Sequence, residues 1–367
     1  MKKILFLLFV FLLTGCSDYR ELNDLAIVSG INIGMDHDIY NVSVQVIDTN
    51  DKSVSSNNSN YYVYNYSSKS LHEAFRNIVK FSPKKIYASQ LQVLIIDESL
   101  AANGVNDILD FFVRNPDIRS NFYILIGSDD NIFDTSTNNI STSNIFNSIN
   151  SNNKYLGLSN KVTFIDLLSV YLNDKQELAI PSIKFSSEGN NPLIGDISVF
   201  KGNKLVGYLD DLESLTYNII MNNVSNYLVN IDLENNSYIT SNILYSKCYI
   251  GVNPKDNVID INIMGSASIS TNNSNYDLEN IDDFNKVQYL LNNEINNLIS
   301  ESINSIIDKY NSDIFGFQDL YYKNDYNYYN NHIKNNWYSN YLKNIKFNIN
   351  SNIKITEKGF LNGGLYE

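Results

Sequence analysis

The stretch DDFNKVQYLLNNEINNLISESINSIIDKY, residues 282–310, is the longest periodic segment of the chain. Its apolar residues recur at the spacing of one helix face: Val287, Leu291, Ile295, Ile299, Ile303, Ile306 and Tyr310. The pattern predicts a long amphipathic helix. Such a helix either lies across an antiparallel sheet as part of a core or binds a partner along its apolar face.

Strand patterns lie on both sides of this helix. Residues 239–252 and 258–270 are predicted strands joined by the turn Asn253-Pro254-Lys255-Asp256, and residues 345–355 alternate as a last strand. We therefore expect residues 239–367 to form an antiparallel sheet with one long helix.

The first half of the chain alternates between strand and helix patterns. The predicted strands are residues 25–34, 40–48, 61–66, 91–97 and 121–127, and the predicted helices are residues 71–79, 106–114 and 163–172. Residues 178–185 contain Pro181 and are predicted to close the sheet as an edge strand, where proline is tolerated. This alternation indicates an N-terminal α/β domain over residues 16–186.

A Ser/Glu/Gly/Asn/Pro stretch at residues 186–192 reads as a linker. It precedes a predicted hairpin over residues 195–209, with Gly202-Asn203 in its turn, and a helix over residues 212–222. These elements suggest a small central domain, residues 187–238. The predicted fold class is α+β, with three consecutive mixed α/β domains and largely antiparallel sheets, after a cleaved lipoprotein signal peptide.

The N-terminus predicts export. Lys2 and Lys3 precede an unbroken apolar run, Ile4–Leu13, which is too short to span a bilayer, where a helix needs ~20 residues. The run ends in Leu13-Thr14-Gly15-Cys16, the pattern of a bacterial lipobox. We expect residues 1–15 to be a signal peptide, cleavage between Gly15 and Cys16, and a diacylglyceryl group on Cys16. The alternative is an ordinary signal peptide followed by a chance cysteine.

Composition restricts the partners. The net charge of −13 argues against nucleic-acid binding and against electrostatic adhesion to anionic lipid. Attachment to a membrane would therefore rest on the lipid, whose two acyl chains suffice for stable anchoring. The second of the two cysteines, Cys248, then has no partner for an internal disulfide and is expected to be an inert core thiol.

Candidate catalytic and metal-binding residues are few. His37, His72 and His332 are far apart in sequence, and Asp36-His37-Asp38 is expected in a hairpin turn rather than at a metal. The pairs Asp129-Asp130 and Asp210-Asp211 follow strands, where acidic residues form turns or cap helices. No phosphate loop, nucleophile elbow or Cys/His pair is present. We expect no cofactor, no metal and no catalytic residue, with a surface hydrolase as a weaker alternative.

Several motifs resemble one family. They are residues 18–28 (DYRELNDLAIV), 83–87 (PKKIY), 91–96 (LQVLII), 109–115 (LDFFVRN) with Arg119, 199–201 and 204–207 (VFK and KLVG), 313–317 (DIFGF), Trp337 and Gly359. Together they resemble the Ger(x)C family, the C-subunit lipoproteins of spore nutrient germinant receptors.

The resemblance implies a non-enzymatic subunit, needed for nutrient-triggered germination and held by Cys16 on the outer face of the spore inner membrane. Its implied partners are two multi-span membrane subunits of the same receptor, A-type and B-type, and small-molecule recognition is assigned mainly to a membrane partner. Three α/β domains in a row are the implied fold. The alternative function is a solute-binding lipoprotein of a membrane importer.

Overall fold

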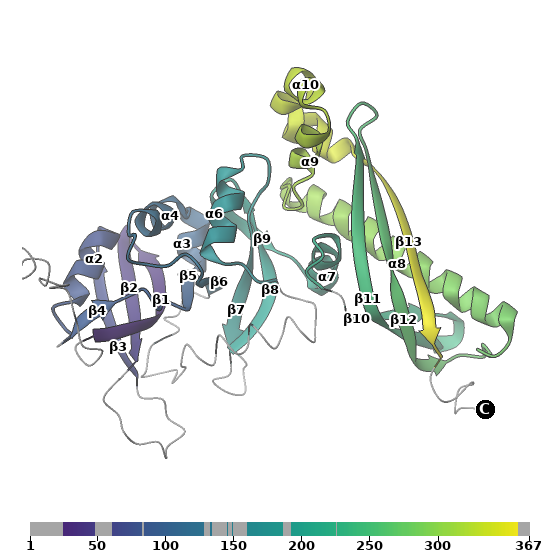
Figure 1. The fold of residues 1–367 in the computed structure, drawn as a ribbon, viewed down its shortest axis with the longest axis horizontal. Helices are drawn as coiled ribbons and strands as arrows, with labels where there is room; N and C mark the ends of the chain where they lie inside the picture. Colours follow the sequence, from purple (N-terminus) through teal and green to yellow (C-terminus); the bar gives the residue numbers. More distant parts are fainter. Residues whose placement is uncertain are drawn as a thin grey trace, which may run out of the picture.

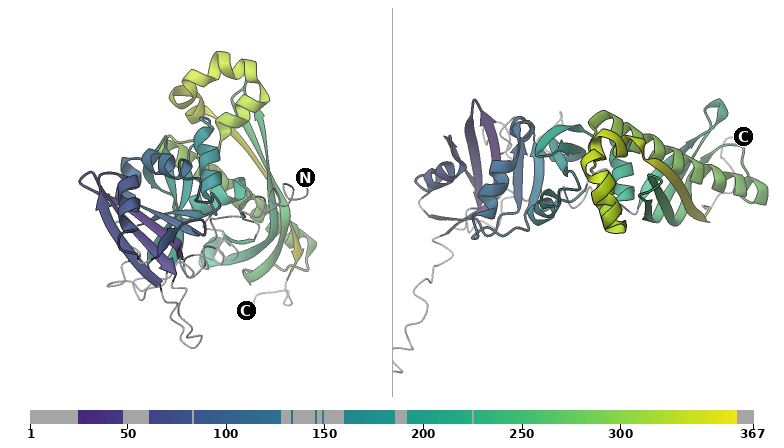
Figure 2. Two further views of the ribbon diagram at one scale, coloured as in Figure 1. Left: turned by 60° about the vertical axis from the view of Figure 1, so that its left-hand side comes forward. Right: turned by 90° about the horizontal axis from the view of Figure 1, so that it is seen from above.

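The computed structural model describes residues 25–47, 61–82, 84–127, 160–185, 192–224 and 226–358, together with the single residues Phe133, Ile145 and Ile149. The predicted signal peptide and Cys16 lie outside these ranges. The described part is elongated, with two β-sheet units placed end to end (Figure 1). The two other views agree on this arrangement (Figure 2).

The first unit is built on a sheet in which nine strands are described, in the order β3-β2-β1-β5-β6-β7-β8-β9, with β4 beside β1. Their bounds are β1 (Leu25–Asp36), β2 (Ile39–Ile47), β3 (Tyr61–Ser68), β4 (Lys85–Tyr87), β5 (Val93–Asp97), β6 (Tyr123–Gly127), β7 (Ala179–Phe185), β8 (Pro192–Lys201) and β9 (Lys204–Tyr208). The helices are α2 (Leu71–Ile78), α3 (Glu98–Asn103), α4 (Asn106–Val113) and α6 (Phe164–Leu172). Their apolar side chains share one core with alternate residues of β1, β2 and β6.

The strand β7 is interior to this sheet, which corrects the prediction that it is an edge. It pairs in parallel with β6 through Ser182 and Ile183, and antiparallel with β8 along its whole length. Pro181 faces Ile197 of β8 at a register shift, and the pairing of β7 with β6 begins at the next residue, Ser182. A proline is therefore tolerated here because β6 pairs only with the residues that follow it.

The predicted central segment, residues 187–238, has no separate sheet among its described residues. The hairpin β8–β9 extends the first sheet, whereas the strand β10 (Tyr227–Asp232) belongs to the second. Between them, α7 (Asp211–Ile220) packs into the core of the second unit. The strands of this segment are thus divided between the two units, because β8 pairs with β7 of the first sheet and β10 pairs with β11 of the second.

The second unit combines a sheet with the long helix predicted at the outset. In its described residues the strand order is β10-β11-β12-β13, with β11 (Tyr238–Asn253), β12 (Val258–Asn273) and β13 (Lys346–Glu357). The helix α8 (Ile281–Tyr310) buries its apolar stripe against this sheet, and Val287, Leu291 and Ile295 are fully buried. The stripe is therefore core rather than a free docking face. The segment between α8 and β13 holds α9 (Phe317–Asn324), α10 (Tyr326–Tyr328) and four short helical turns (Tyr329–Ile333, Lys334–Asn336, Trp337–Tyr341, Leu342–Asn344).

The predicted α+β class is confirmed, and both sheets are mixed. In the second sheet β13 runs parallel to β12, where antiparallel pairing was expected throughout. The reason is the length of α8. Its 30 residues span about 45 Å, close to the roughly 50 Å of the 16-residue β12, so the helix returns the chain toward the end where β12 began.

The outer edge of β13 is closed by amide side chains of α8. Ile353 donates its backbone N–H to Asn292 Oδ1 at 2.8 Å, and Asn292 Nδ2 donates back to the Ile353 carbonyl at 3.1 Å. Ser351 N–H bonds to Asn296 Oδ1 at 2.9 Å, and Ile355 N–H bonds to Gln288 Oε1 at 2.8 Å. The spacing of residues four apart on one helix face thus matches the spacing of N–H groups two residues apart on a strand, about 6–7 Å in each case. These bonds saturate an edge that could otherwise pair with another chain.

We predict that Asn292→Ala lowers the free energy of unfolding by about 1–3 kcal/mol, because it leaves backbone groups of β13 without partners. Asn304→Ala on the same helix is the matched control, since Asn304 is exposed and bonds only to its own helix among the described contacts. Urea unfolding of both variants tests this. Equal losses in the two variants would contradict a specific role for the edge contacts.

Candidate functional site

Two of the sequence motifs meet where the two units join. Residues 199–201 end β8 of the first sheet, and residues 311–316 form the turn between α8 and α9 of the second unit. Ser312 Oγ donates to the Phe200 carbonyl at 2.6 Å, and Gln176 Nε2 donates to the Ile314 carbonyl at 3.0 Å. We call this contact the joint, defined by Glu177, Lys201, Ser312, Asp313 and Tyr338.

Glu177 is the centre of the joint. Its backbone N–H donates to the Asp313 carbonyl at 3.0 Å. One carboxylate oxygen accepts from the Tyr338 hydroxyl at 2.6 Å, and the other accepts from the Gly202 N–H, also at 2.6 Å. A single, largely buried side chain therefore connects the turn of the β8–β9 hairpin to the helical segment before β13.

Lys201 supplies the positive charge. Its ammonium lies 3.8 Å from Glu177 Oε1 and 2.9 Å from the centroid of the Tyr338 ring, and it donates to the Asn311 carbonyl. Burial lowers the pKa of Lys201 to about 8, against the opposing pull of the carboxylates of Glu177 and Asp313. This cation–π contact thus links Lys201 of the first unit to Tyr338 of the second.

Asp313 is fully buried at the start of α9. Phe317 donates its N–H to Oδ1 at 2.9 Å, and Gln318 donates its N–H to Oδ2 at 2.7 Å. Burial raises the pKa of Asp313 to about 7, although these N–H groups favour the charged form. The residue caps α9 from a position where water is excluded.

Two glycines allow the units to approach closely. A Cβ on Gly207 of β9 would lie 2.5 Å from the ring of Tyr310, whose hydroxyl bonds to the Tyr208 carbonyl. Gly316 has a φ of 73°, and a Cβ there would lie 3.1 Å from the Gln176 side chain. Both belong to the motifs quoted above, so the motifs encode packing at the joint as well as polar contacts.

The polar groups of the joint are linked to one another, and Glu177, Ser312 and Asp313 are buried. Two carboxylates share one ammonium, and each named group bonds across the boundary or to a helix end. The arrangement can fix the orientation of the two units and can respond to protonation. Its polar contacts position the two units relative to each other.

The predicted site residues lie elsewhere or are outside the description. Gly15, Cys16 and the pair Asp129-Asp130 fall outside the described residues. Asp210 caps α7 in a capping box with Glu213, as expected for an acidic cap. Cys248 is a free, buried thiol, and burial raises its pKa to about 12, which keeps it unreactive as expected.

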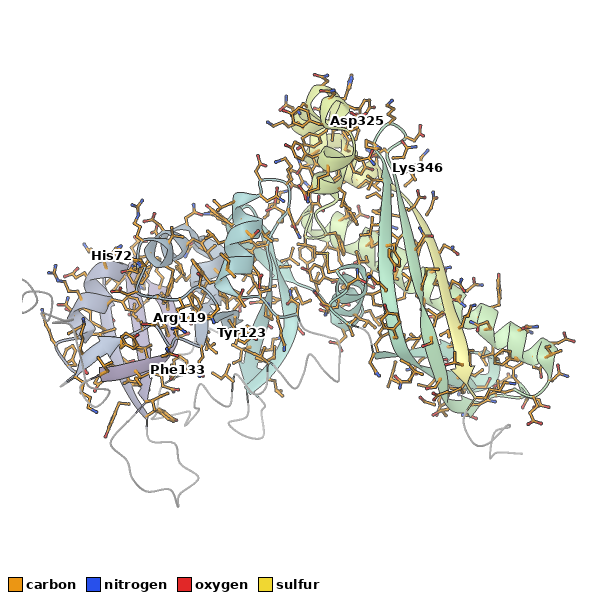
Figure 3. All side chains as sticks on the ribbon, viewed as in Figure 1. His72, Arg119, Tyr123, Phe133, Asp325 and Lys346 are labelled. Carbon is orange, nitrogen blue, oxygen red and sulfur yellow. The ribbon has the colours of Figure 1, made fainter. Side chains whose placement is uncertain are left out.

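The three histidines are not brought together. His37 lies in the β1–β2 turn beside Asp36, and His332 contacts the ring of Tyr328. His72 on α2 packs on Phe111 in the first unit, far from the segment of Asp325 and Lys346 in the second (Figure 3). Within the described ranges no three His, Cys, Asp or Glu side chains form a group able to hold a metal ion. In the same ranges no helix is long and apolar enough to cross a membrane.

Sequence reasoning found part of the joint. Lys201, Asp313 and Gly316 stand in the quoted motifs, but Glu177 and Tyr338 were missed. Glu177 lies in a polar turn after α6, and Tyr338 is one of 27 tyrosines. No local signal distinguishes either from a surface residue.

With this geometry described, comparison with known proteins assigns the class. Residues 18–185 match the family model of the spore germination protein N-terminal domain, and residues 195–359 match that of the spore germination B3/GerAC-like C-terminal domain. The chain therefore belongs to the GerAC-like spore germination proteins.

Individual relatives agree with this family. The chain is 31% identical over 132 residues to a putative spore germination protein, YfkR, of Bacillus subtilis (strain 168), covering 34% of each chain. It is 30% identical over 125 residues to spore germination protein KC of the same organism, covering 32% of this chain and 31% of that one. The matches thus span about a third of these relatives. The crystal structure of the GerBC protein has the same fold, with a TM-score of 0.59 at 16% identity over 92% of this chain and 100% of that one.

We predict that Asp313→Asn flattens part of the pH dependence of stability. The folded-state pKa of Asp313, about 7, lies above its ordinary value of 3.8, so the folded protein holds this proton more tightly. Its contribution to stability is present below pH 4 and is lost as the pH rises to 7, by up to about 1.4 kcal/mol per pH unit. Lys201 contributes in the opposite direction only above its pKa of about 8.

Urea unfolding of the wild type and of Asp313→Asn at intervals from pH 4 to 8 measures this difference. The exposed Asp211 of α7 provides the control substitution, Asp211→Asn. If the difference between wild type and Asp313→Asn changes no more with pH than that for the control, Asp313 does not titrate in this range.

Proposed function

We infer that this protein is a lipid-anchored accessory subunit of a spore nutrient germinant receptor, without catalysis of its own. The observation that carries the proposal is the match of both halves to spore germination domains in a chain whose N-terminal segment contains Leu13-Thr14-Gly15-Cys16. The related proteins are themselves named for spore germination.

The anchor is the diacylglyceryl group on Cys16. Two acyl chains bind a bilayer stably without electrostatic help, which suits a chain with a net charge of −13. The described residues begin at Leu25, so only eight residues (17–24) separate Cys16 from β1. In an extended conformation eight residues reach at most about 29 Å. The anchor would therefore hold the first unit near the membrane surface.

The partners in this proposal are two multi-span membrane subunits, A-type and B-type, at the outer face of the spore inner membrane. They follow from the resemblance to the Ger(x)C family. The fixed orientation of the two units at the joint suits a subunit that presents extended surfaces to partners.

The importer alternative has less support. A solute-binding lipoprotein would be expected to have two similar α/β lobes with a ligand between them. The two units here have unlike sheets, nine described strands in one and four in the other. The boundary between the units is occupied by the buried joint.

We predict that Cys16→Ala releases the protein from membranes or leaves it unprocessed, because the lipid can no longer be attached. Fractionation and mass determination of the mature N-terminus measure this. Cys248→Ala is the control and should remain anchored, since its thiol is buried in the core. A Cys16→Ala protein that stays membrane-bound and fully processed would refute the lipid anchor.

We further predict that affinity purification of the protein from spore membranes recovers two polytopic subunits. Deletion of the gene should abolish or slow germination in response to at least one nutrient, while germination by a non-nutrient trigger is retained. Normal germination with every nutrient tested, in a strain lacking related receptors, would overturn the proposal.

A further inference from the structure

The first sheet carries a row of apolar side chains at the end where β1 begins. Tyr87 of β4 pairs with Ile27 of β1. Ile27 also pairs with Ile47 of β2, and Ile47 pairs with Tyr61 of β3. Residues that pair across neighbouring strands share a face of the sheet. These four side chains therefore form one continuous row across four strands, which we call the strip.

The strip lies on the face of the sheet that is not covered by α2 and α4. Its neighbours in sequence on β1, β2 and β4 point the other way and pack in the core with those helices. In the strip itself Ile47 is 42% exposed and Tyr87 is 37% exposed, while Ile27 and Tyr61 are partly buried. Two isoleucines and two tyrosines are thus presented together at the surface. This composition suits a lipid–water interface, where tyrosine is enriched.

The connection between α2 and β4 adds positive charge at the same end. Lys85 lies two residues before Tyr87 on β4, so it shares the face of the strip. Both Lys85 and Lys80 are exposed, and neither forms an ion pair among the described residues. Between them stands Phe81, which is 58% exposed. Lysines beside apolar side chains are the combination that binds phospholipid headgroups.

The chain itself brings this end of the sheet to the membrane. If Cys16 carries the lipid, residues 17–24 are the whole connection between the anchor and Leu25. Eight residues reach at most about 29 Å. Leu25 is paired with Lys85 and lies two residues before Ile27, so the connection ends beside the strip. The anchor therefore holds the strip, rather than a distant surface, within reach of the bilayer.

The acidic character of the chain as a whole does not prevent this contact. The second unit joins the first beyond β9, and α2, β3 and β4 lie at the opposite end of the molecule (Figure 1). Five strand spacings separate β1 from β9, roughly 24 Å. Exposed charges farther apart than about 8 Å are largely screened at physiological ionic strength. Locally, residues 17–24 carry three acidic residues and one arginine, and the lysines offset that charge.

We propose that the strip, together with Lys80 and Lys85, lies on the phospholipid bilayer and fixes the orientation of the first unit on it. The proposal rests on the lipid anchor proposed above and adds a second contact to it. The apolar side chains enter the headgroup layer, and the two ammonium groups reach lipid phosphates. Because the joint fixes the second unit relative to the first, the same contact sets the direction in which the second unit extends from the membrane.

The first test uses the lipidated protein in vesicles of phosphatidylcholine and phosphatidylglycerol. A fluorophore on Ile47→Cys reports on the strip. The new thiol is the reactive one, because Cys16 carries the lipid and Cys248 is buried. Met264→Cys is the matched control, since Met264 is also an exposed apolar residue of a strand, at 52%, but in the second unit.

A quencher on the lipid headgroups should quench the label at position 47 more strongly than the label at position 264. Equal quenching of the two labels, in protein that floats with the vesicles, would overturn the proposal and leave the lipid anchor intact. It would show that the strip faces away from lipid, as it would if a protein partner covered it. If Ile47→Cys fails to fold, Tyr87→Cys carries the label instead.

The second test needs no anchor. It uses the mature chain from residue 16 with Cys16→Ala and measures its co-sedimentation with the same vesicles. Combining Lys80→Gln with Lys85→Gln should weaken binding about tenfold or more, since each lysine at an anionic surface contributes about fivefold. The control combines Lys346→Gln with Lys354→Gln, at two exposed positions of β13, and should bind as the parent chain does.

Equal binding by the two double variants would overturn the proposal, because the lipid contact would then lie elsewhere. Absence of binding by the parent chain at about 10 mM lipid would also overturn it. This second test gives a result even if Cys16 carries no lipid in spores. Failure of the anchor and failure of the surface contact are therefore separate outcomes.

Discussion

The burial of two carboxylates with one ammonium is the constraint on which the arrangement of this molecule depends. Glu177 and Asp313 come from different units, and Lys201 reaches the boundary from the end of β8. Charged groups can be buried only if each finds partners, and here the partners lie across the boundary or at the start of α9. A rotation of one unit against the other would leave these groups desolvated and unpaired. The polar contacts therefore specify one orientation of the two units.

The same need to satisfy buried polar groups explains the second unit. Its long helix buries an apolar stripe against the sheet, which any amphipathic helix could do. The distinguishing feature of α8 is a row of three amide side chains, Gln288, Asn292 and Asn296. They accept hydrogen bonds from the backbone N–H groups of β13, as a neighbouring strand would. Asparagine and glutamine suit this role because each amide carries both a donor and an acceptor. The high asparagine content of the chain thus has structural consequences, whatever its origin.

Local patterns predicted most elements, because helix and strand periodicities are visible within one segment. The helix over residues 282–310 and the hairpin of β11 and β12 are confirmed. The interior position of β7, the parallel pairing of β13 and the sharing of the central segment between two sheets were not foreseen. These depend on which strands meet in space, and no period within a segment records that. The prediction of an edge strand from Pro181 was wrong for the same reason. Proline has no N–H, and it is excluded only at positions where a neighbouring strand needs that donor.

Candidate sites were harder to predict than the fold, and for a physical reason. Local sequence motifs record only groups that are close together in the chain, whereas the joint is assembled from distant segments. Glu177 and Tyr338 are 161 residues apart in the sequence. Their shared feature is burial of a polar side chain, which single-sequence patterns cannot report. At the joint such burial is matched by partners from the other unit. Because those partners come from segments far apart in the sequence, only the folded chain shows that the buried charges of Glu177 and Asp313 are satisfied.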